Sequence, residues 1–79
     1  MHELSITQNI VAVVTEKAAG RPVTAVRLLI GERAGIDAEA IAFCFELCCQ
    51  GTALEGARLD VESSAGAELL IRSMEVTDV

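Results

Sequence analysis

Residues 23–30, VTAVRLLI, carry the alternation of a half-buried β-strand. Val26, Leu28 and Ile30 fall on one side of this strand, and Arg27 falls on the other side. Gly31 ends the pattern. A strand with one apolar face needs a second layer on that face, and the flanking sequence supplies it.

A helix is predicted before this strand, from about Leu4 to Ala19, with Ser5 as a cap near its start and Gly20 as its stop. Its apolar residues recur at helical spacing, namely Leu4, Ile6, Ile10, Val13 and Val14. The first residues of the chain therefore lie directly on a helix that packs the core.

A second helix is predicted to start at Asp37 and to end at Gly51, which suits a left-handed terminator. Its expected buried stripe consists of Ile41, Cys44, Phe45 and Cys48. Phe43 falls beside the polar face, where it either packs on the flank of the helix or contacts another chain.

Two more strands are expected towards the end of the chain. Leu59 and Val61 alternate with polar residues, a turn at about 62–68 closes a hairpin, and a final strand includes Leu69 and Val76. The apolar parity of the final strand changes near Arg72, which predicts a β-bulge there. The order α-β-α-β-β predicts an α+β two-layer sandwich, with two helices on one face of a three-stranded mixed sheet.

The composition narrows the classes of function. A chain of 79 residues makes a single domain, and 52% hydrophobic residues allow it an aliphatic core. A formal charge of -6 without a basic cluster argues against nucleic acid or anionic membranes as partners. With no membrane span and no secretion signal in the sequence, we expect a cytoplasmic protein. An exposed strand edge leaves homodimer formation open.

Three cysteines, Cys44, Cys48 and Cys49, crowd into six residues, which is a poor disulfide framework. Cys44 and Cys48 share a helical face, but tetrahedral zinc needs two further ligands that the nearby sequence lacks. We therefore expect these two to pack in the core. Cys49 falls at the polar edge of the helix, so we expect it to be the most reactive of the three.

The first residues, Met1-His2-Glu3, form a candidate metal site. The Met1 amine, the His2 main-chain nitrogen and the His2 ring can form fused chelate rings, completed by the Glu3 main-chain nitrogen or carboxylate. Deprotonated amides with an imidazole suit a square-planar ion, which indicates nickel or copper. The alternative is an uninformative chain end.

No enzymatic constellation can be assembled from the sequence. His2 is the single histidine, so no Ser-His-Asp or Cys-His pair exists away from the terminus, and no phosphate-binding loop occurs. Asp37 has an ordinary role as the cap of the second helix. The chain is therefore not expected to be an enzyme.

The chain resembles the HypA/HybF hydrogenase-maturation metallochaperones in a series of segments that follow in order. These are MHELSI, GRPVTAVRLLIG, ERAGID, AFCFEL, GTALEGARL and AELLIRSMEV. The resemblance implies the same fold, Ni(II) as the bound metal, and a role for Asp37 beside Met1, His2 and Glu3. It also implies a maturation GTPase and the hydrogenase large subunit as partners.

One departure from this family is large. Members carry a zinc domain with two Cys-x-x-Cys pairs between the last two strands, whereas residues 62–68 stand in its place here. We therefore expect a single nickel-binding domain, residues 1–79, without zinc. Two hypotheses follow: a nickel-delivery module for a nickel enzyme, most simply a [NiFe]-hydrogenase, or a zinc-domain-deleted scaffold, natural or engineered, with vestigial nickel binding.

Overall fold

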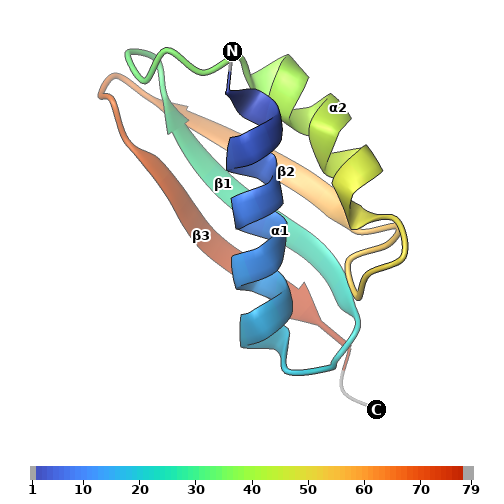
Figure 1. The fold of residues 1–79 in the computed structure, drawn as a ribbon. Helices are drawn as coiled ribbons and strands as arrows, with labels where there is room; N and C mark the ends of the chain where they lie inside the picture. The colour runs from blue at the N-terminus through green and yellow to red at the C-terminus, as the bar shows by residue number, and fades with distance from the viewer. Residues whose placement is uncertain (1, 78–79) are drawn as a thin grey trace.

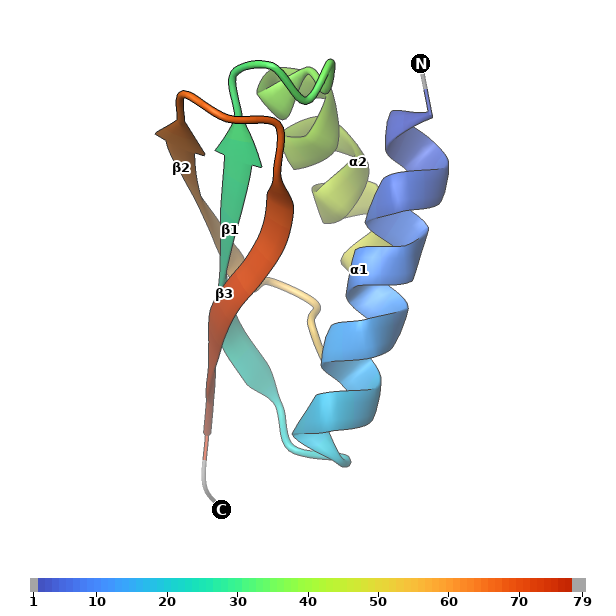
Figure 2. The ribbon, with the colours of Figure 1, turned by 90° about the vertical axis from the view of Figure 1, so that its left-hand side faces the viewer.

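The computed structural model describes residues 2–77. Its elements, in chain order, are α1 (Glu3–Ala18), β1 (Val23–Gly31), α2 (Ala38–Cys49), β2 (Arg58–Ser64) and β3 (Leu69–Val76). Both helices cover the same face of the sheet, as Figures 1 and 2 show from two directions. The predicted α+β two-layer sandwich is confirmed, including the order of its elements.

The strand order of the sheet is β2-β1-β3, with β2 parallel and β3 antiparallel to β1. The predicted hairpin between the last two strands is therefore wrong, since β2 and β3 lie at opposite edges. The physical reason is the connection through α2, which brings β2 back parallel to β1 on one side. β3 then pairs with the other edge of the apolar strand β1.

Residues 65–68 cross the end of β1 to reach the far edge, and main-chain hydrogen bonds fix them there. The N–H of Gly31 donates to the carbonyl oxygen of Glu68 at 2.7 Å, and that of Glu32 donates to Ser64 at 2.8 Å. The N–H of Arg33 donates to Gly66, also at 2.8 Å. The short connection is thus an ordered part of the fold, attached to the turn that follows β1.

Gly31 lies under this crossing, and its replacement by alanine should destabilise the protein. A Cβ at this position would collide with the carbonyl oxygen of Gly66 and stand 2.6 Å from the carbonyl carbon. Both atoms are main chain, so the crossing has to shift, and overpacking of this kind costs about 2 kcal/mol. Urea unfolding followed by circular dichroism measures the loss.

Thr24→Ala is the matched control, because Thr24 is exposed at the opposite end of the same strand. We expect it to change the free energy of unfolding by less than about 0.5 kcal/mol. Equal stability of Gly31→Ala and the wild type would show that the crossing segment is not held as the hydrogen bonds indicate.

Helix α1 buries one stripe against the sheet: Thr7, Ile10, Val11, Val14 and Ala18. Leu4 and Val13, expected in the core, remain 52% and 43% exposed. Thr7 takes the place of an apolar residue because its hydroxyl donates to the carbonyl oxygen of Glu3 at 2.6 Å, which satisfies it inside the helix. The prediction for this helix was thus right for Ile10 and Val14, which are buried, and wrong for Leu4 and Val13.

The buried interior is aliphatic and centres on β1. Its fully buried large side chains come from both helices, β1 and the loop before β2, namely Val14, Val26, Leu28, Ile41 and Leu54. Neither helix of the described residues is long and apolar enough to cross a lipid bilayer.

The bulge predicted in the last strand is confirmed. Arg27 pairs with Ser73 and Leu28 pairs with Ile71, so Arg72 is the extra residue of β3. Such a bulge also makes the free edge of β3 less suitable for pairing with another strand.

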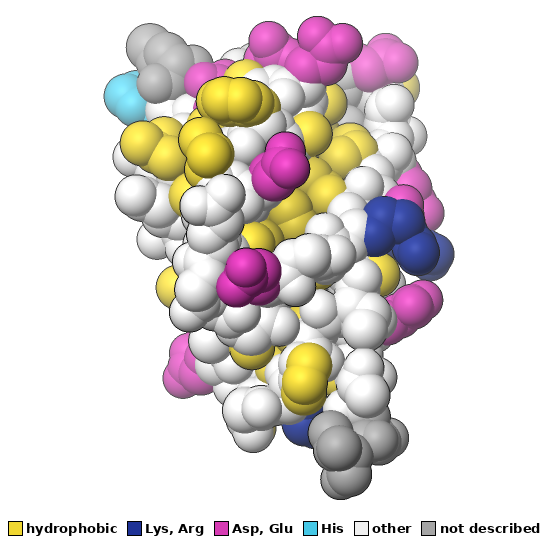
Figure 3. All heavy atoms as spheres, turned by 90° about the vertical axis from the view of Figure 1, so that its right-hand side faces the viewer, with side chains coloured by type: hydrophobic (Ala, Val, Ile, Leu, Met, Phe, Trp, Pro, Cys, Tyr) yellow, Lys and Arg dark blue, Asp and Glu magenta, His cyan; other side chains and the backbone are white. Residues whose placement is uncertain are grey.

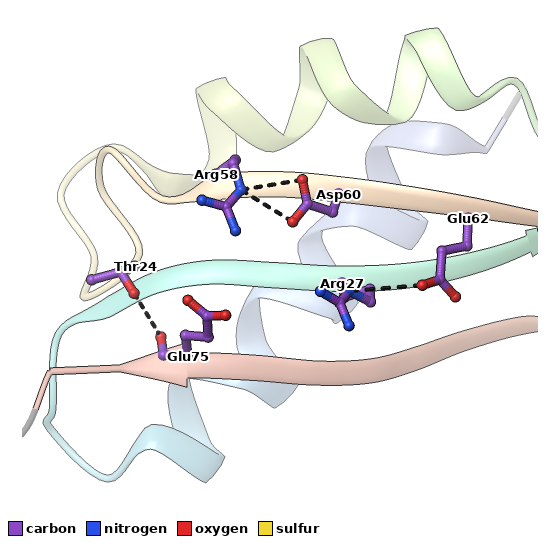
Figure 4. A network of polar contacts seen from close by, with 6 residues as sticks. All are labelled: Thr24, Arg27, Arg58, Asp60, Glu62 and Glu75. Carbon is purple, nitrogen blue, oxygen red and sulfur yellow. Dashed lines mark hydrogen bonds and ion pairs between the residues drawn. The ribbon is translucent and has the colours of Figure 1, made fainter.

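A network of polar side chains lies on the face of the sheet away from the helices (Figure 4). On it, Arg27 lies 3.8 Å from Glu62, and Arg58 lies 3.1 Å from Asp60. These pairs are largely exposed, so they add little stability. Their effect is to keep the open face compatible with water.

Candidate metal site at the start of helix α1

His2 stands at the N-cap position of α1, with its side chain exposed. Its carbonyl oxygen accepts the first helical hydrogen bond, from the N–H of Ile6 at 2.9 Å. No side chain caps this end of α1, so the prediction that Ser5 acts as a cap was wrong. Main-chain N–H groups of a first helical turn have no helical acceptor. The main-chain N–H groups of His2 and Glu3 are therefore not part of the hydrogen bonds between turns of α1.

Glu3 connects the start of α1 to the start of α2. One carboxylate oxygen of Glu3 lies 3.4 Å from the main-chain nitrogen of Asp37 and accepts its hydrogen bond. The terminal ammonium group lowers the pKa of the Glu3 carboxyl most, followed by the N–H groups of Glu3 itself and of Asp37. Glu3 is thus ionised at neutral pH, which adds a negative charge beside His2.

Asp37 caps α2, as the sequence predicted. Its Oδ1 accepts from the N–H of Glu39 at 2.9 Å and from that of Ala40 at 3.4 Å. The contact with Glu3 comes through the Asp37 main chain, so the structure brings two of the predicted site residues together. The turn before α2 thereby lies next to the candidate metal site.

Met1, the fourth predicted site residue, lies outside the described residues. Within residues 2–77, no group of three or more His, Cys, Asp and Glu side chains is arranged to hold a metal ion. The site predicted at the start of α1 differs from such a group, because its expected donors include main-chain nitrogens together with the His2 ring. That donor set suits a square-planar divalent ion, as the sequence indicated.

The cysteines differ from the prediction. Cys49 is buried, with 2% of its surface exposed, whereas Cys44 and Cys48 are half-buried. The stripe of α2 that packs on the sheet is Ile41, Phe45 and Cys49, each four residues apart. Burial, and secondarily the neighbouring Cys48, raises the pKa of the Cys49 thiol to about 11. Cys49 is therefore a core residue whose thiol stays protonated at neutral pH, and the expectation that it lies at the polar edge of the helix was wrong.

A groove of about 520 Å³ between the two helices was not found from the sequence. Its walls combine apolar and polar side chains: Gln8, Val11, Ala12, Thr15, Glu16, Cys48 and Thr52. Apolar side chains also gather on the face of the molecule that Figure 3 shows. Phe43 is 66% exposed, so it does not pack on the flank of α2.

Comparison with known proteins decides the family. The model of the family described as "Hydrogenase/urease nickel incorporation, metallochaperone, hypA" matches residues 1–69. The chain belongs to the HypA family. The matched residues include His2, Glu3 and Asp37.

Individual HypA relatives agree with this assignment. The hydrogenase maturation factor HypA of Rippkaea orientalis is 59% identical over 61 residues, which cover 77% of this chain and 54% of the relative. The HypA of a Geobacter species is 56% identical over 66 residues, which cover 84% of this chain and 60% of the relative. The chain thus spans little more than half the length of these HypA proteins.

The fold agrees as well. The solution structure of the nickel metallochaperone HypA from Helicobacter pylori matches with a TM-score of 0.72, covering 99% of this chain and 95% of that one. Sequence identity is only 17%, so this comparison supports the HypA fold and no individual residue.

Proposed function

We propose that this chain is a nickel-binding metallochaperone module that carries Ni(II) for the maturation of a nickel enzyme. The observation that carries the proposal is the HypA family match over residues 1–69. The exposed His2 at the open start of α1 supports it, because a metal held there is accessible to a receiving protein.

The nickel ion is cargo in this proposal and the chain performs no catalysis. Its donors are the Met1 amine, the His2 main-chain nitrogen and ring, and Glu3. Asp37 joins them or acts only through its contact with Glu3. The receiving enzyme is a hydrogenase or a urease, the two that the family description names.

A maturation GTPase and the large subunit of the receiving hydrogenase are the proposed partners, in the cytoplasm. Beyond these, a second copy of the chain is a possible contact at the open edges of the sheet. The chain is proposed to act as one domain without resident zinc, because residues 65–68 already join β2 to β3 with main-chain hydrogen bonds.

Complementation tests delivery directly. In cells that lack their own HypA, the untagged chain should restore nickel-dependent hydrogenase activity at limiting nickel, and His2→Ala should not. Asn9→Ala, an exposed substitution elsewhere on α1, serves as the control and should restore activity like the parent chain. Restoration by His2→Ala would instead favour the scaffold hypothesis, in which the chain assembles partners without carrying metal.

A further inference from the structure

Two free thiols lie on the same side of α2, away from the nickel site. Cys44 and Cys48 are both half-buried and neither forms a disulfide. Residues four apart on a helix are neighbours, with Cβ atoms about 5–6 Å apart. The helix therefore holds the two sulfur atoms as a pair that solvent can reach.

The position of the pair relative to α1 is also defined. Cys48 lines the groove between the helices, opposite Val11, Ala12 and Thr15. The hydroxyl oxygen of Thr15 is buried there and has no hydrogen-bond partner among the described residues. Val11 and Ala12 make the part of the groove opposite Cys48 apolar, so an ion bound at Cys48 is partly shielded from water, although Gln8, Glu16 and Thr52 also line the groove.

The coordination number of such a site is restricted. No third His, Cys, Asp or Glu side chain in residues 2–77 completes a group with these two. Cys49, the adjacent cysteine, is directed into the core and is 2% exposed. Tetrahedral zinc needs four ligands and square-planar nickel needs four as well, so two thiolates alone suit neither ion.

We propose that Cys44 and Cys48 form a second metal site that binds one monovalent soft ion, Cu(I), through two thiolates. Soft thiolate ligands select Cu(I), and this ion accepts two sulfur ligands without a third. Two thiols lose two protons as Cu⁺ binds, which leaves a bis-thiolate complex of net charge −1 and no change in oxidation state. The two sites differ in donor type, since the start of α1 offers nitrogen and oxygen and α2 offers sulfur.

Competition with a chromophoric Cu(I) chelator, bicinchoninate, tests the proposal on the reduced full chain without oxygen. The wild type should take one Cu(I) per chain, and His2→Ala should bind it equally well. Cys44→Ser and Cys48→Ser should each weaken binding by roughly 100-fold, the low end of the gain from linking two ligands. Cys49→Ala should retain the wild-type affinity.

Two outcomes of this competition experiment overturn the site. One is full Cu(I) affinity in either serine variant, and the other is loss of binding in His2→Ala. X-ray absorption on the copper-loaded wild type counts the sulfur ligands independently, because this experiment does not depend on the folding of any variant. Two sulfur scatterers with a monomeric chain in sedimentation support the site, while any other count or a copper-bridged dimer contradicts it.

Discussion

Nickel should bind at one ion per chain to protein that begins with an unmodified Met1, and His2→Ala should abolish this binding. The His2 ring and the adjacent main-chain nitrogens supply the chelate rings, so alanine removes a donor that no other histidine can replace. An extra residue before Met1 should also abolish tight binding, because it converts the terminal amine to an amide. Calorimetry and the visible absorption band of square-planar Ni(II) measure both effects.

Glu3 and Asp37 provide graded controls for the same experiment. Glu3→Ala should weaken nickel binding less than His2→Ala if Glu3 contributes chiefly its main-chain nitrogen. Asp37→Asn keeps a good helix cap, since asparagine is as effective at this position as aspartate. Unchanged affinity in Asp37→Asn would make Asp37 a cap alone, and reduced affinity would make it a ligand. Equal nickel affinity in the native, His2→Ala and extended proteins would rule out the terminal site.

The sequence predicted those features that depend on local pattern. The alternation of residues 23–30 located β1, the change of parity near Arg72 located the bulge, and Asp37 was recognised as a cap. In each case a few neighbouring residues determine the conformation. The metal site at Met1, His2 and Glu3 was likewise predicted from neighbouring residues, and it stays a prediction until nickel binding is measured.

Features that depend on contacts between distant segments were missed or misplaced. The path of the chain through α2 and the crossing at residues 65–68 place β2 and β3 at opposite edges of β1. No local pattern shows this arrangement, so the prediction of a hairpin between β2 and β3 was wrong. The contact between Glu3 and the Asp37 main chain joins segments 34 residues apart and has no local signal.

The rotation of α2 is the clearest example of a misplaced prediction. Cys44 with Cys48 and Phe45 with Cys49 both have the spacing of a helical stripe. In the structure the second pair is buried in the core. Which of two similarly hydrophobic faces of a helix is buried depends on the shape of the sheet that the helix covers. That selection changes the chemistry, since it buries the Cys49 thiol and leaves the Cys44 and Cys48 thiols half-buried.

The buried Cys49 thiol should make the protein less stable in alkali. Its pKa is raised from 9.0 to about 11 in the folded protein. Well below pH 9 the thiol is protonated in the folded and the unfolded chain alike, so there it contributes no pH dependence. Between pH 9 and pH 11 the unfolded chain releases this proton while the folded chain retains it. Stability therefore falls as the pH rises through this range.

A shift of two pKa units corresponds to about 3 kcal/mol, which sets the scale of the expected loss. Urea unfolding at a series of pH values, followed by circular dichroism under reducing conditions, measures it. The chain suits this test because it has no tyrosine and its single lysine is Lys17, so few other side chains titrate in the range.

Cys49→Ala isolates the effect. Below pH 9 this variant should be less stable than the wild type by about 1 kcal/mol or more, because it leaves a small cavity, but its stability should depend much less on pH above 9. Cys44→Ser, at a half-buried position, should keep the wild-type pH dependence. An unchanged alkaline slope in Cys49→Ala would mean that Cys49 ionises as readily in the folded protein as in the unfolded chain. That result would contradict its assignment to the core, and with it the argument that α2 presents Cys44 and Cys48 as the accessible thiol pair.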